Sequence, residues 1–258
     1  MQIRVFASGS SGNCLLVSDG DAHIMIDAGI PMRRIQSSLA RCGLTRQDLT
    51  GVLITHEHSD HIFGLGMLAK YCSVPVYAPH TVASRLLGML PQLDDALQVI
   101  PVDEPFSVGS VAVTAFHTPH DTDESVSYRL EGSAVYAHAT DTGSVTEELL
   151  RGLSGADTVL IEANHDERML RDGPYPFYLK KRILSARGHL SNADCAALAR
   201  RLVESGARRV VLGHLSETNN RPELATAAVC AALAGLDAEV YCTTPDGLLS
   251  VPVGDEPC

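Results

Sequence analysis

Short apolar runs separated by Gly- and Ser-rich turns predict β-strands through the first half of the chain. After Pro31 a helix is expected, running through Arg34, Leu39 and Cys42. Along this half the pattern predicts strands at 3–7, 14–18, 23–27, 51–55, 75–78, 97–100, 111–116, 125–130 and 134–137, and helices at 62–71 and 81–89.

The second half alternates more regularly between strands and helices. Ser191 or Asn192 is expected to cap a helix that reaches Ser205, and Pro222 suits the first turn of another. The pattern predicts strands at 158–162, 209–212, 238–242 and 247–251, helices at 167–170, 176–185 and 222–234, and a loosely held tail at 254–258.

Two similar halves of strands and helices indicate two sheets that face each other. Continuous apolar runs such as Val210-Val211-Leu212 fit strands buried on both faces. We therefore expect one domain over residues 1–258 of the α/β (α+β) class. Its architecture would be an αββα sandwich of two facing mixed β-sheets with helices on the outer faces.

Composition narrows the class of protein. The chain has 258 residues, and no window approaches the eighteen apolar residues of a membrane span. Its N-terminus lacks the long apolar core of a secretory signal and is predicted to form the first strand. Seven cysteines, with no C-x-x-C, are typical of reduced thiols in a cytoplasm.

The formal net charge of −11 gives the chain no general attraction to nucleic acid or anionic membranes. One local exception combines basic and aromatic residues. Such a stretch is equally compatible with a solvated helix face and with a surface that holds phosphates and stacks bases. It contains Lys180, Lys181, Arg182 and Arg187, with Tyr175, Phe177 and Tyr178 beside them and no acid from 176 to 190.

Four metal-binding side chains lie within six residues, in an H-x-H-x-D-H string that follows a predicted buried strand. They are His56, His58, Asp60 and His61. Imidazole and carboxylate together suit zinc, manganese or iron. The dense spacing favours a metal site over a solvated polar loop.

Further candidate ligands also follow predicted strands. His120 and Asp121 come after 111–116, Asp141 comes after 134–137, and His214 follows 209–212. Open α/β folds gather their chemistry at strand ends. We therefore expect these side chains to converge with the string at 56–61.

At these residues the chain resembles the metallo-β-lactamase superfamily, and most closely its YycJ/WalJ-like branch. The resemblance implies the αββα sandwich, two divalent metal ions and nuclease-type phosphodiester hydrolysis, in that branch 5′-to-3′ exonuclease action on DNA. The strings that carry it are Gly9-Ser-Ser-Gly-Asn13, Asp27-Ala-Gly29, residues 55–61, His120-Asp121, Thr140-Asp-Thr-Gly143, Glu162-Ala-Asn-His-Asp166, Gly188-His-Leu-Ser-Asn192 and residues 212–220.

The resemblance assigns His56, His58 and His120 to one ion. Asp60, His61 and His214 go to the other, and Asp141 bridges them because a carboxylate can bridge where an imidazole normally cannot. Ions about 3.5–4 Å apart would share a hydroxide that attacks phosphorus. The ions would be Zn²⁺ or Mn²⁺, and Fe²⁺ also fits such ligands.

One ligand has a competitor, because His117 lies three residues before His120. Asp121 beside His120 matches the branch, so we choose His120. The acidic string 121–124 departs from the usual pattern, and it would either repel a polyanion near the site or face solvent.

Other polar residues are candidates for orienting the metal ligands or binding phosphate. Asp27 is expected either to hydrogen-bond a ligand histidine or to form a turn. Gly9 to Asn13 would bind phosphate through Asn13 and a nest of backbone amides, or form an ordinary hairpin turn.

A second set of candidates lies in the second half. Asn164 and His165 are candidates for binding phosphate or protonating the leaving oxygen. His189 with Ser191 is a further phosphate-site hypothesis, set against a simple helix-capping loop. We accordingly count Asp60, Asp141, His165 and His189 as catalytic candidates, and Asn13, Asn164 and Ser191 as substrate-binding ones.

The sequence thus predicts a two-metal hydrolase, most simply a phosphodiesterase or exonuclease on DNA rather than RNA. The alternative is a small-molecule hydrolase of the same fold that cleaves a thioester, lactone or cyclic phosphodiester. A bridging hydroxide attacks carbonyl carbon equally well, so the ligand set alone does not separate the two. The acidic net charge favours the second, and the basic-aromatic stretch favours the first.

Overall fold

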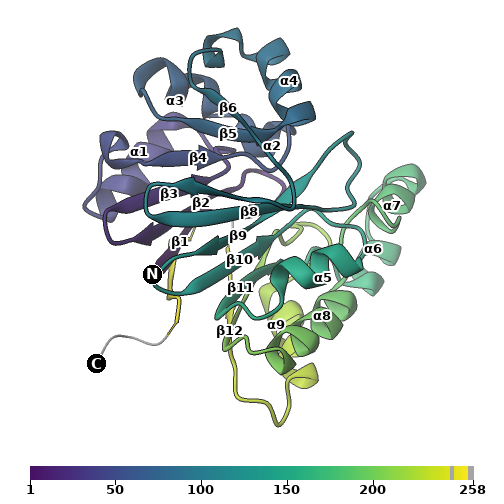
Figure 1. Ribbon diagram of the computed structural model, residues 1–258. Coiled ribbons are helices and arrows are strands. Elements are labelled where there is room, and N and C mark those ends of the chain that lie inside the picture. Colours follow the sequence, from purple (N-terminus) through teal and green to yellow (C-terminus); the bar gives the residue numbers. More distant parts are fainter. Residues whose placement is uncertain (245–246, 255–258) are drawn as a thin grey trace.

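Two mixed β-sheets face each other in the computed structural model, which describes residues 1–244 and 247–254 (Figure 1). The sheet on the N-terminal side has the order β14-β1-β2-β3-β4-β5-β6 over the described residues. Its strands are β1 (Gln2–Ala7), β2 (Cys14–Asp19), β3 (Ala22–Ile26), β4 (Gly51–Leu53), β5 (Val76–Pro79), β6 (Leu97–Ile100) and β14 (Leu249–Pro252).

The second sheet has the order β13-β12-β11-β10-β9-β8-β7. Each sheet is antiparallel at one end and parallel at the other, with β3 to β6 and β10 to β13 forming the parallel parts. Its strands are β7 (Pro105–Val108), β8 (Val111–His117), β9 (Val126–Glu131), β10 (Val135–Ala139), β11 (Thr158–Glu162), β12 (Arg209–Gly213) and β13 (Glu239–Cys242).

Helices lie on the outer side of each sheet (Figure 1). The connections between strands of the first sheet contain α1 (Met32–Arg41), α2 (Ser59–Ile62), α3 (Leu65–Tyr71) and α4 (His80–Met89). The second half contributes α5 (Glu147–Leu153), α6 (Glu167–Asp172), α7 (Phe177–Ile183), α8 (Asn192–Glu204) and α9 (Pro222–Ala232), and 3₁₀ turns lie at Arg46–Asp48 and Pro91–Leu93.

Three hydrophobic clusters explain the layered architecture. In β12, Val210 and Leu212 pack on the helices while Val211 points between the sheets. In β3, Met25 likewise faces the helices while Ile24 and Ile26 face the other sheet. Successive side chains of a strand point to opposite faces, so continuous apolar runs bury both faces. This confirms the predicted αββα sandwich of α/β class.

Several elements differ from the prediction. The helix expected at 62–71 is two helices, α2 and α3, separated near Gly64. The Gly64 amide donates to Ala28 O (2.7 Å), and a Cβ there would lie 2.3 Å from Ile30 O, so the chain turns where only glycine fits. The strand expected at 51–55 ends at Leu53.

Two elements were missed. Helix α5 is capped by Thr146, whose hydroxyl accepts from Leu149 N, and β7 pairs with β8 as a hairpin. The strand expected at 247–251 begins later, at Leu249. Of the tail expected at 254–258, residues 255–258 lie outside the described residues.

Two other expectations from composition bear on the described residues. None of the helices found there is long and apolar enough to cross a membrane. The six cysteines found there are all free thiols.

Candidate metal centre

Loops that leave the ends of four strands bring the predicted ligands together. His56 and His58 lie in the loop after β4, and Asp60 and His61 follow in α2. His120 comes from the loop after β8. Asp141 and His214 come from the turns after the parallel strands β10 and β12. The convergence expected from strand order is therefore present in the fold.

The backbone is left-handed at two of these exits. Asp141 has φ 56° and His214 has φ 53°, and Asp27, which follows β3, has φ 58°. Non-glycine residues adopt this region rarely, at a cost of about 1–3 kcal/mol each when strained. Three of the four such residues in the described chain are thus at the centre, where the turn aims each side chain at its neighbours.

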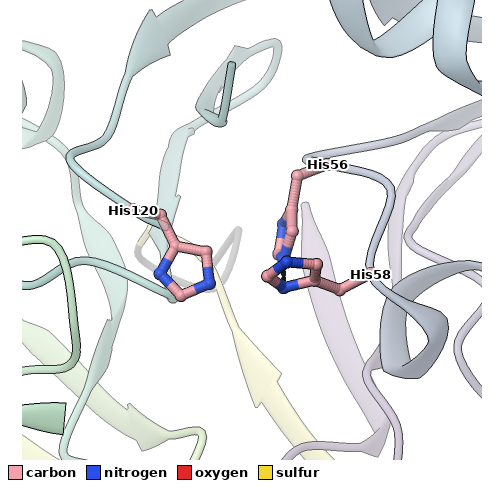
Figure 2. A group of neighbouring side chains, drawn as sticks. All are labelled: His56, His58 and His120. Atoms are coloured by element: carbon pink, nitrogen blue, oxygen red, sulfur yellow. Dashed lines mark hydrogen bonds between the residues drawn. The ribbon is translucent and has the colours of Figure 1, made fainter. Parts of the chain in front are cut away.

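The first group contains three histidines. The candidate ligand atoms of His56, His58 and His120 all lie within 4.8 Å of one another. His56 Nε2 is 3.0 Å from His58 Nδ1. Figure 2 shows these two imidazoles facing the His120 ring, which reaches toward them from the second half of the chain.

The second group contains Asp60, His61 and His214, whose ligand atoms also lie within 4.8 Å of one another. Asp141 lies between the two groups. Its Oδ2 is 3.2 Å from His61 Nε2, and its Oδ1 is 3.3 Å from His214 Nε2 and 3.7 Å from His120 Nε2. One carboxylate is therefore within reach of both groups.

Most of the imidazoles have a partner on the nitrogen that points away from the centre. Asp27 Oδ2 lies 2.7 Å from His61 Nδ1. This agrees with the expectation that Asp27 hydrogen-bonds a ligand histidine. Partners of this kind fix the tautomer and leave the inner nitrogen to bind a metal. The others are Thr55 Oγ1 for His56 (3.0 Å), Asn13 Oδ1 for His214 (3.1 Å) and Gly188 O for His120 (3.3 Å).

Charge and burial at the centre fit a bound cation. Asp141 is buried, and its Oδ2 has no hydrogen bond. Burial alone would raise the pKa of Asp141, but His214 and His61 outweigh it and hold that pKa well below its usual value. Burial lowers the pKa of His56 well below its ordinary value, so this imidazole is neutral and able to bind a metal. The nitrogen and oxygen donors are those of transition-metal sites.

A family model described as a beta-lactamase superfamily domain matches residues 22–215. The chain belongs to the metallo-β-lactamase superfamily. Over 255 residues it is 36% identical to exodeoxyribonuclease WalJ of Streptococcus pneumoniae serotype 2 (strain D39), a match that covers 94% of each chain. It is also 36% identical to exodeoxyribonuclease YycJ of Bacillus anthracis over 233 residues, covering 89% of this chain and 88% of that one.

Solved structures share the fold of this chain. Zn²⁺-bound PqqB from Methylobacterium extorquens superimposes with a TM-score of 0.73 at 20% identity, over 98% of this chain and 100% of that one. The metallo-β-lactamase fold protein YhfI from Bacillus subtilis gives 0.71 at 18% identity, over 96% and 99%. At such identities the likeness concerns the fold alone.

The structure separates the two competing histidines of this metallo-β-lactamase chain. His120 is buried beside Asp141, as described above. His117 is exposed, and its ring nitrogens lie 3.1 Å from Glu148 Oε1 and 3.6 Å from Glu124 Oε1. His117 therefore lies outside the ligand groups.

The acidic string at 121–124 is paired with neighbouring groups. Asp121 forms an ion pair with Arg182, and Asp123 forms one with Arg85. Glu124 Oε2 accepts from Thr81 N at 2.8 Å. These partners offset the negative charge, so of the two expectations for this string, repulsion of a polyanion is not supported.

The part-buried His189 pairs with the buried Glu162 at the edge of the centre. His189 Nδ1 lies 2.6 Å from Glu162 Oε1, and the His189 ring stacks on that of His214 with centroids 5.3 Å apart. Burial lowers the pKa of His189, but the Glu162 carboxylate outweighs it and raises that pKa to about 9. Sequence reasoning gave Glu162 no function, although it ends β11 just as the ligands follow their own strands.

Three of the residues predicted for catalysis or substrate binding, apart from the metal ligands, do not line the cavity over the centre. Asn13 lies among the second group of ligands, since its Nδ2 is 3.0 Å from His61 Nε2 and 3.3 Å from Asp60 Oδ2, and it is absent from the cavity lining. The amides of Gly9, Gly12 and Asn13 bond within the protein, so these three are not available to a phosphate. The contacts of Asn13 favour a role in orienting ligands, and its role in binding substrate stays a prediction.

Ser191 and His165 are also placed elsewhere. Ser191 accepts from Asp194 N and donates to Asp194 Oδ2, because it caps α8. This agrees with the capping alternative. His165 is buried, and neither of its ring nitrogens has a hydrogen bond. Asn164, in contrast, lines the cavity and donates from Nδ2 to His214 O at 3.1 Å.

The cavity over the centre has a volume of about 250 Å³. Candidate ligands form part of its lining, together with His189 and Asn164. Another part comes from α7 and the turn before it, through Tyr175, Leu179 and Arg182. A substrate at the metal centre would therefore touch both the ligand loops and α7.

Proposed function

We propose that this chain is a two-metal phosphodiesterase that removes nucleotides from DNA ends. The observation that carries the chemistry is the position of Asp141 between two three-ligand groups. The substrate is supported by the two relatives named exodeoxyribonucleases, which match this chain over most of their length. A cytoplasmic location and a preference for DNA over RNA belong to this proposal.

In the proposed centre His56, His58 and His120 would hold one divalent ion. Asp60, His61 and His214 would hold the other, with Asp141 available to both. When bound, such a pair supplies the Lewis acidity that activates water and offsets negative charge on a phosphate. Zn²⁺ and Mn²⁺ suit these ligands best, and Fe²⁺ is also compatible with them.

The chain's own groups then handle orientation and protons. Because Glu162 raises the pKa of His189 to about 9, the His189 ring is a cation at neutral pH, with a proton on each nitrogen. Glu162 holds Nδ1, which leaves Nε2 free to donate to a phosphate oxygen or to the leaving oxygen. The side chain of Asn164 orients the His214 turn through its hydrogen bond to His214 O.

One observation favours the alternative, hydrolysis of a small ester, thioester or lactone. The net charge of −11 gives the chain as a whole no attraction to a polyanion. The substrate test below therefore includes both classes.

The test uses protein loaded with Zn²⁺ or Mn²⁺ and DNA and RNA labelled at either end, single- and double-stranded. We expect stepwise release of nucleotides from one DNA end, and loss of that activity in Asp60→Ala and His61→Ala. His117→Ala is the matched control, since His117 lies outside the ligand groups. Intact polynucleotides together with rapid cleavage of an ester or lactone would establish the alternative instead.

A further inference from the structure

Helix α7 presents two different surfaces. Leu179, Arg182 and Ile183, at spacings of three and four, line the cavity over the metal centre. Phe177, Lys180 and Lys181 line a neighbouring groove together with Leu184, again at spacings of three and four. Residues at this spacing share one face of a helix. The helix therefore joins the metal cavity directly to an outer groove.

The outer surface of α7 carries unusually exposed apolar side chains. Phe177 is 81% exposed, Tyr178 is 73% exposed and Leu184 is 56% exposed. Phe177 and Tyr178 are the two most exposed large hydrophobic residues of the described chain. Phe177 and Leu184 line the same groove, and Tyr178 is the next residue after Phe177. Exposed apolar side chains gathered on one short helix mark a site of interaction more often than an isolated one does.

The charge around these rings is positive, although the chain as a whole is acidic. Lys180 and Lys181 form no ion pair with any residue that the structure describes. Lys180 Nζ donates to the backbone oxygen of Arg171 (2.7 Å), and no acid neutralises it. Arg182, by contrast, is paired with Asp121. Two uncompensated ammonium groups thus lie beside two exposed aromatic rings.

The position of α7 is fixed relative to the candidate catalytic residues. The His189 amide donates to Ile183 O at the end of the helix (3.0 Å), and Arg182 pairs with Asp121 beside His120. A Cβ on Gly188 would lie 2.2 Å from Ile183 O, so this approach needs a glycine. A molecule held on α7 is therefore held in a defined register to His189.

We propose that α7 is a platform for the unpaired nucleotides of a DNA end, and this inference rests on the proposed nuclease function. Phe177 and Tyr178 stack on bases, while Lys180 and Lys181 contact the phosphates between them. Exposed aromatic rings beside cations are the features that bind single strands without sequence preference. Bases inside a duplex are already stacked on both faces, whereas unpaired bases have faces free to stack on the aromatic rings. The strand would run from the outer groove over α7 to the metal centre.

The test measures binding by fluorescence anisotropy with a labelled 12-nucleotide single strand joined by phosphorothioate linkages, which resist hydrolysis. We expect the metal-loaded wild type to bind this strand more tightly than a blunt duplex of the same sequence.

Phe177→Ala/Tyr178→Ala should bind the strand at least about tenfold more weakly, since each stacked base contributes roughly 1–3 kcal/mol and about 1.4 kcal/mol is tenfold. Phe177→Trp/Tyr178→Trp should restore binding. Lys180→Ala/Lys181→Ala should weaken binding and reduce its dependence on salt.

The matched control is Lys70→Ala/Tyr71→Ala on α3. Lys70 Nζ lies 5.5 Å from the centre of the half-exposed Tyr71 ring, so this pair has the same chemistry. Helices α3 and α7 lie on opposite sides of the molecule in Figure 1. The control should bind DNA as the wild type does. Equal losses in both double variants, or wild-type binding by Phe177→Ala/Tyr178→Ala, would overturn the platform.

A second readout separates this inference from the proposed function. The ratio of DNA hydrolysis to hydrolysis of bis(p-nitrophenyl) phosphate should fall in Phe177→Ala/Tyr178→Ala. If the wild type cleaves no phosphodiester but its strand binding still depends on α7, the nuclease proposal fails and the platform stands. If the wild type degrades DNA and the variant binds and degrades it equally well, the platform fails and the nuclease proposal stands.

Discussion

The two halves of the candidate metal centre are built in different ways. The first half supplies four ligands from one short loop, His56 to His61, which follows a single strand. The second half supplies His120, Asp141 and His214 from three separate strand ends, two of them with left-handed backbone. The loop depends on local spacing, whereas the strand ends depend on the whole second sheet.

Each half also has its own buried carboxylate behind the centre. Asp27 accepts from Thr55 N (2.9 Å) and contacts His61, so it supports the ligand loop. Glu162 accepts from Thr142 N (3.0 Å) and contacts His189, which is a candidate proton donor and not one of the seven predicted ligands. The comparison indicates that the first half is built chiefly for holding metal and the second half for metal and proton transfer together.

The largest effect is expected where the two halves meet. Asp141→Ala removes the carboxylate whose two oxygens approach ligands of both groups. We expect about a 10³-fold loss of hydrolysis, because Lewis-acid stabilisation is worth several kcal/mol and about 1.4 kcal/mol is tenfold. Kinetics on labelled DNA and metal content per chain would both be measured. Unchanged metal content with full activity would contradict the central position of Asp141.

His120→Ala tests whether a single strand-end ligand matters as much as one from the loop. We expect it to lower metal content and activity by about 10²-fold, comparable to His58→Ala, since each removes one of three ligands from the same group. His117→Ala is the matched control. It should keep wild-type metal content. If His117→Ala lost more metal than His120→Ala, His117 would be the ligand instead of His120.

Asp27→Asn should weaken metal binding by about 10–100-fold, the usual cost of losing a partner behind a ligand histidine. Excess metal should restore most of the activity, because the ligand atoms themselves remain. Titration with Zn²⁺ or Mn²⁺, followed by activity at saturation, checks this. If activity stays low at saturating metal, Asp27 does more than hold His61 in place.

Glu162→Gln should behave in the opposite way. We expect metal affinity close to that of the wild type and a kcat lowered about 10²-fold, the scale of a general acid. Added metal should not rescue it, because the loss lies in the proton held on His189. Metal titration and steady-state kinetics of this variant, measured beside Asp27→Asn, give the sharpest contrast between the halves. If added metal restored activity, Glu162 would act as Asp27 does, by positioning metal ligands.

The smallest effect is expected away from both halves. Thr146→Ala removes the hydroxyl that caps α5, and should lower the free energy of unfolding by about 1 kcal/mol. Activity at a temperature well below the unfolding transition should be unchanged. Thermal unfolding and DNA hydrolysis measured together would check this, and a lowered kcat would show that α5 influences the centre.

The same contrast explains what the sequence could predict. The loop ligands share a dense local string, and the buried strands are continuous apolar runs, so the pattern alone indicated the loop and the sandwich. The missed helix α5 is seven residues long and depends on packing against β8, β9 and β10. The break at Gly64 depends on the backbone of Ile30, which is remote from it in the sequence.

Long-range contacts also decide where the other predicted site residues lie. The Asn13 side chain is engaged by Gly9, His61 and His214, and two of these partners are remote from it in the sequence. Ser191 could cap a helix or bind phosphate, and only the fold shows that its hydroxyl is used by Asp194. Nothing local to Glu162 indicates its role, because its partner His189 lies 27 residues away in the sequence.

The most direct test of the central claim is anomalous diffraction from crystals of the protein grown with Zn²⁺ or Mn²⁺. We predict two peaks about 3.5–4 Å apart, one beside His56, His58 and His120 and one beside Asp60, His61 and His214, with Asp141 contacting both. A single peak remote from Asp141, or no peak among these seven side chains in active protein, would contradict it.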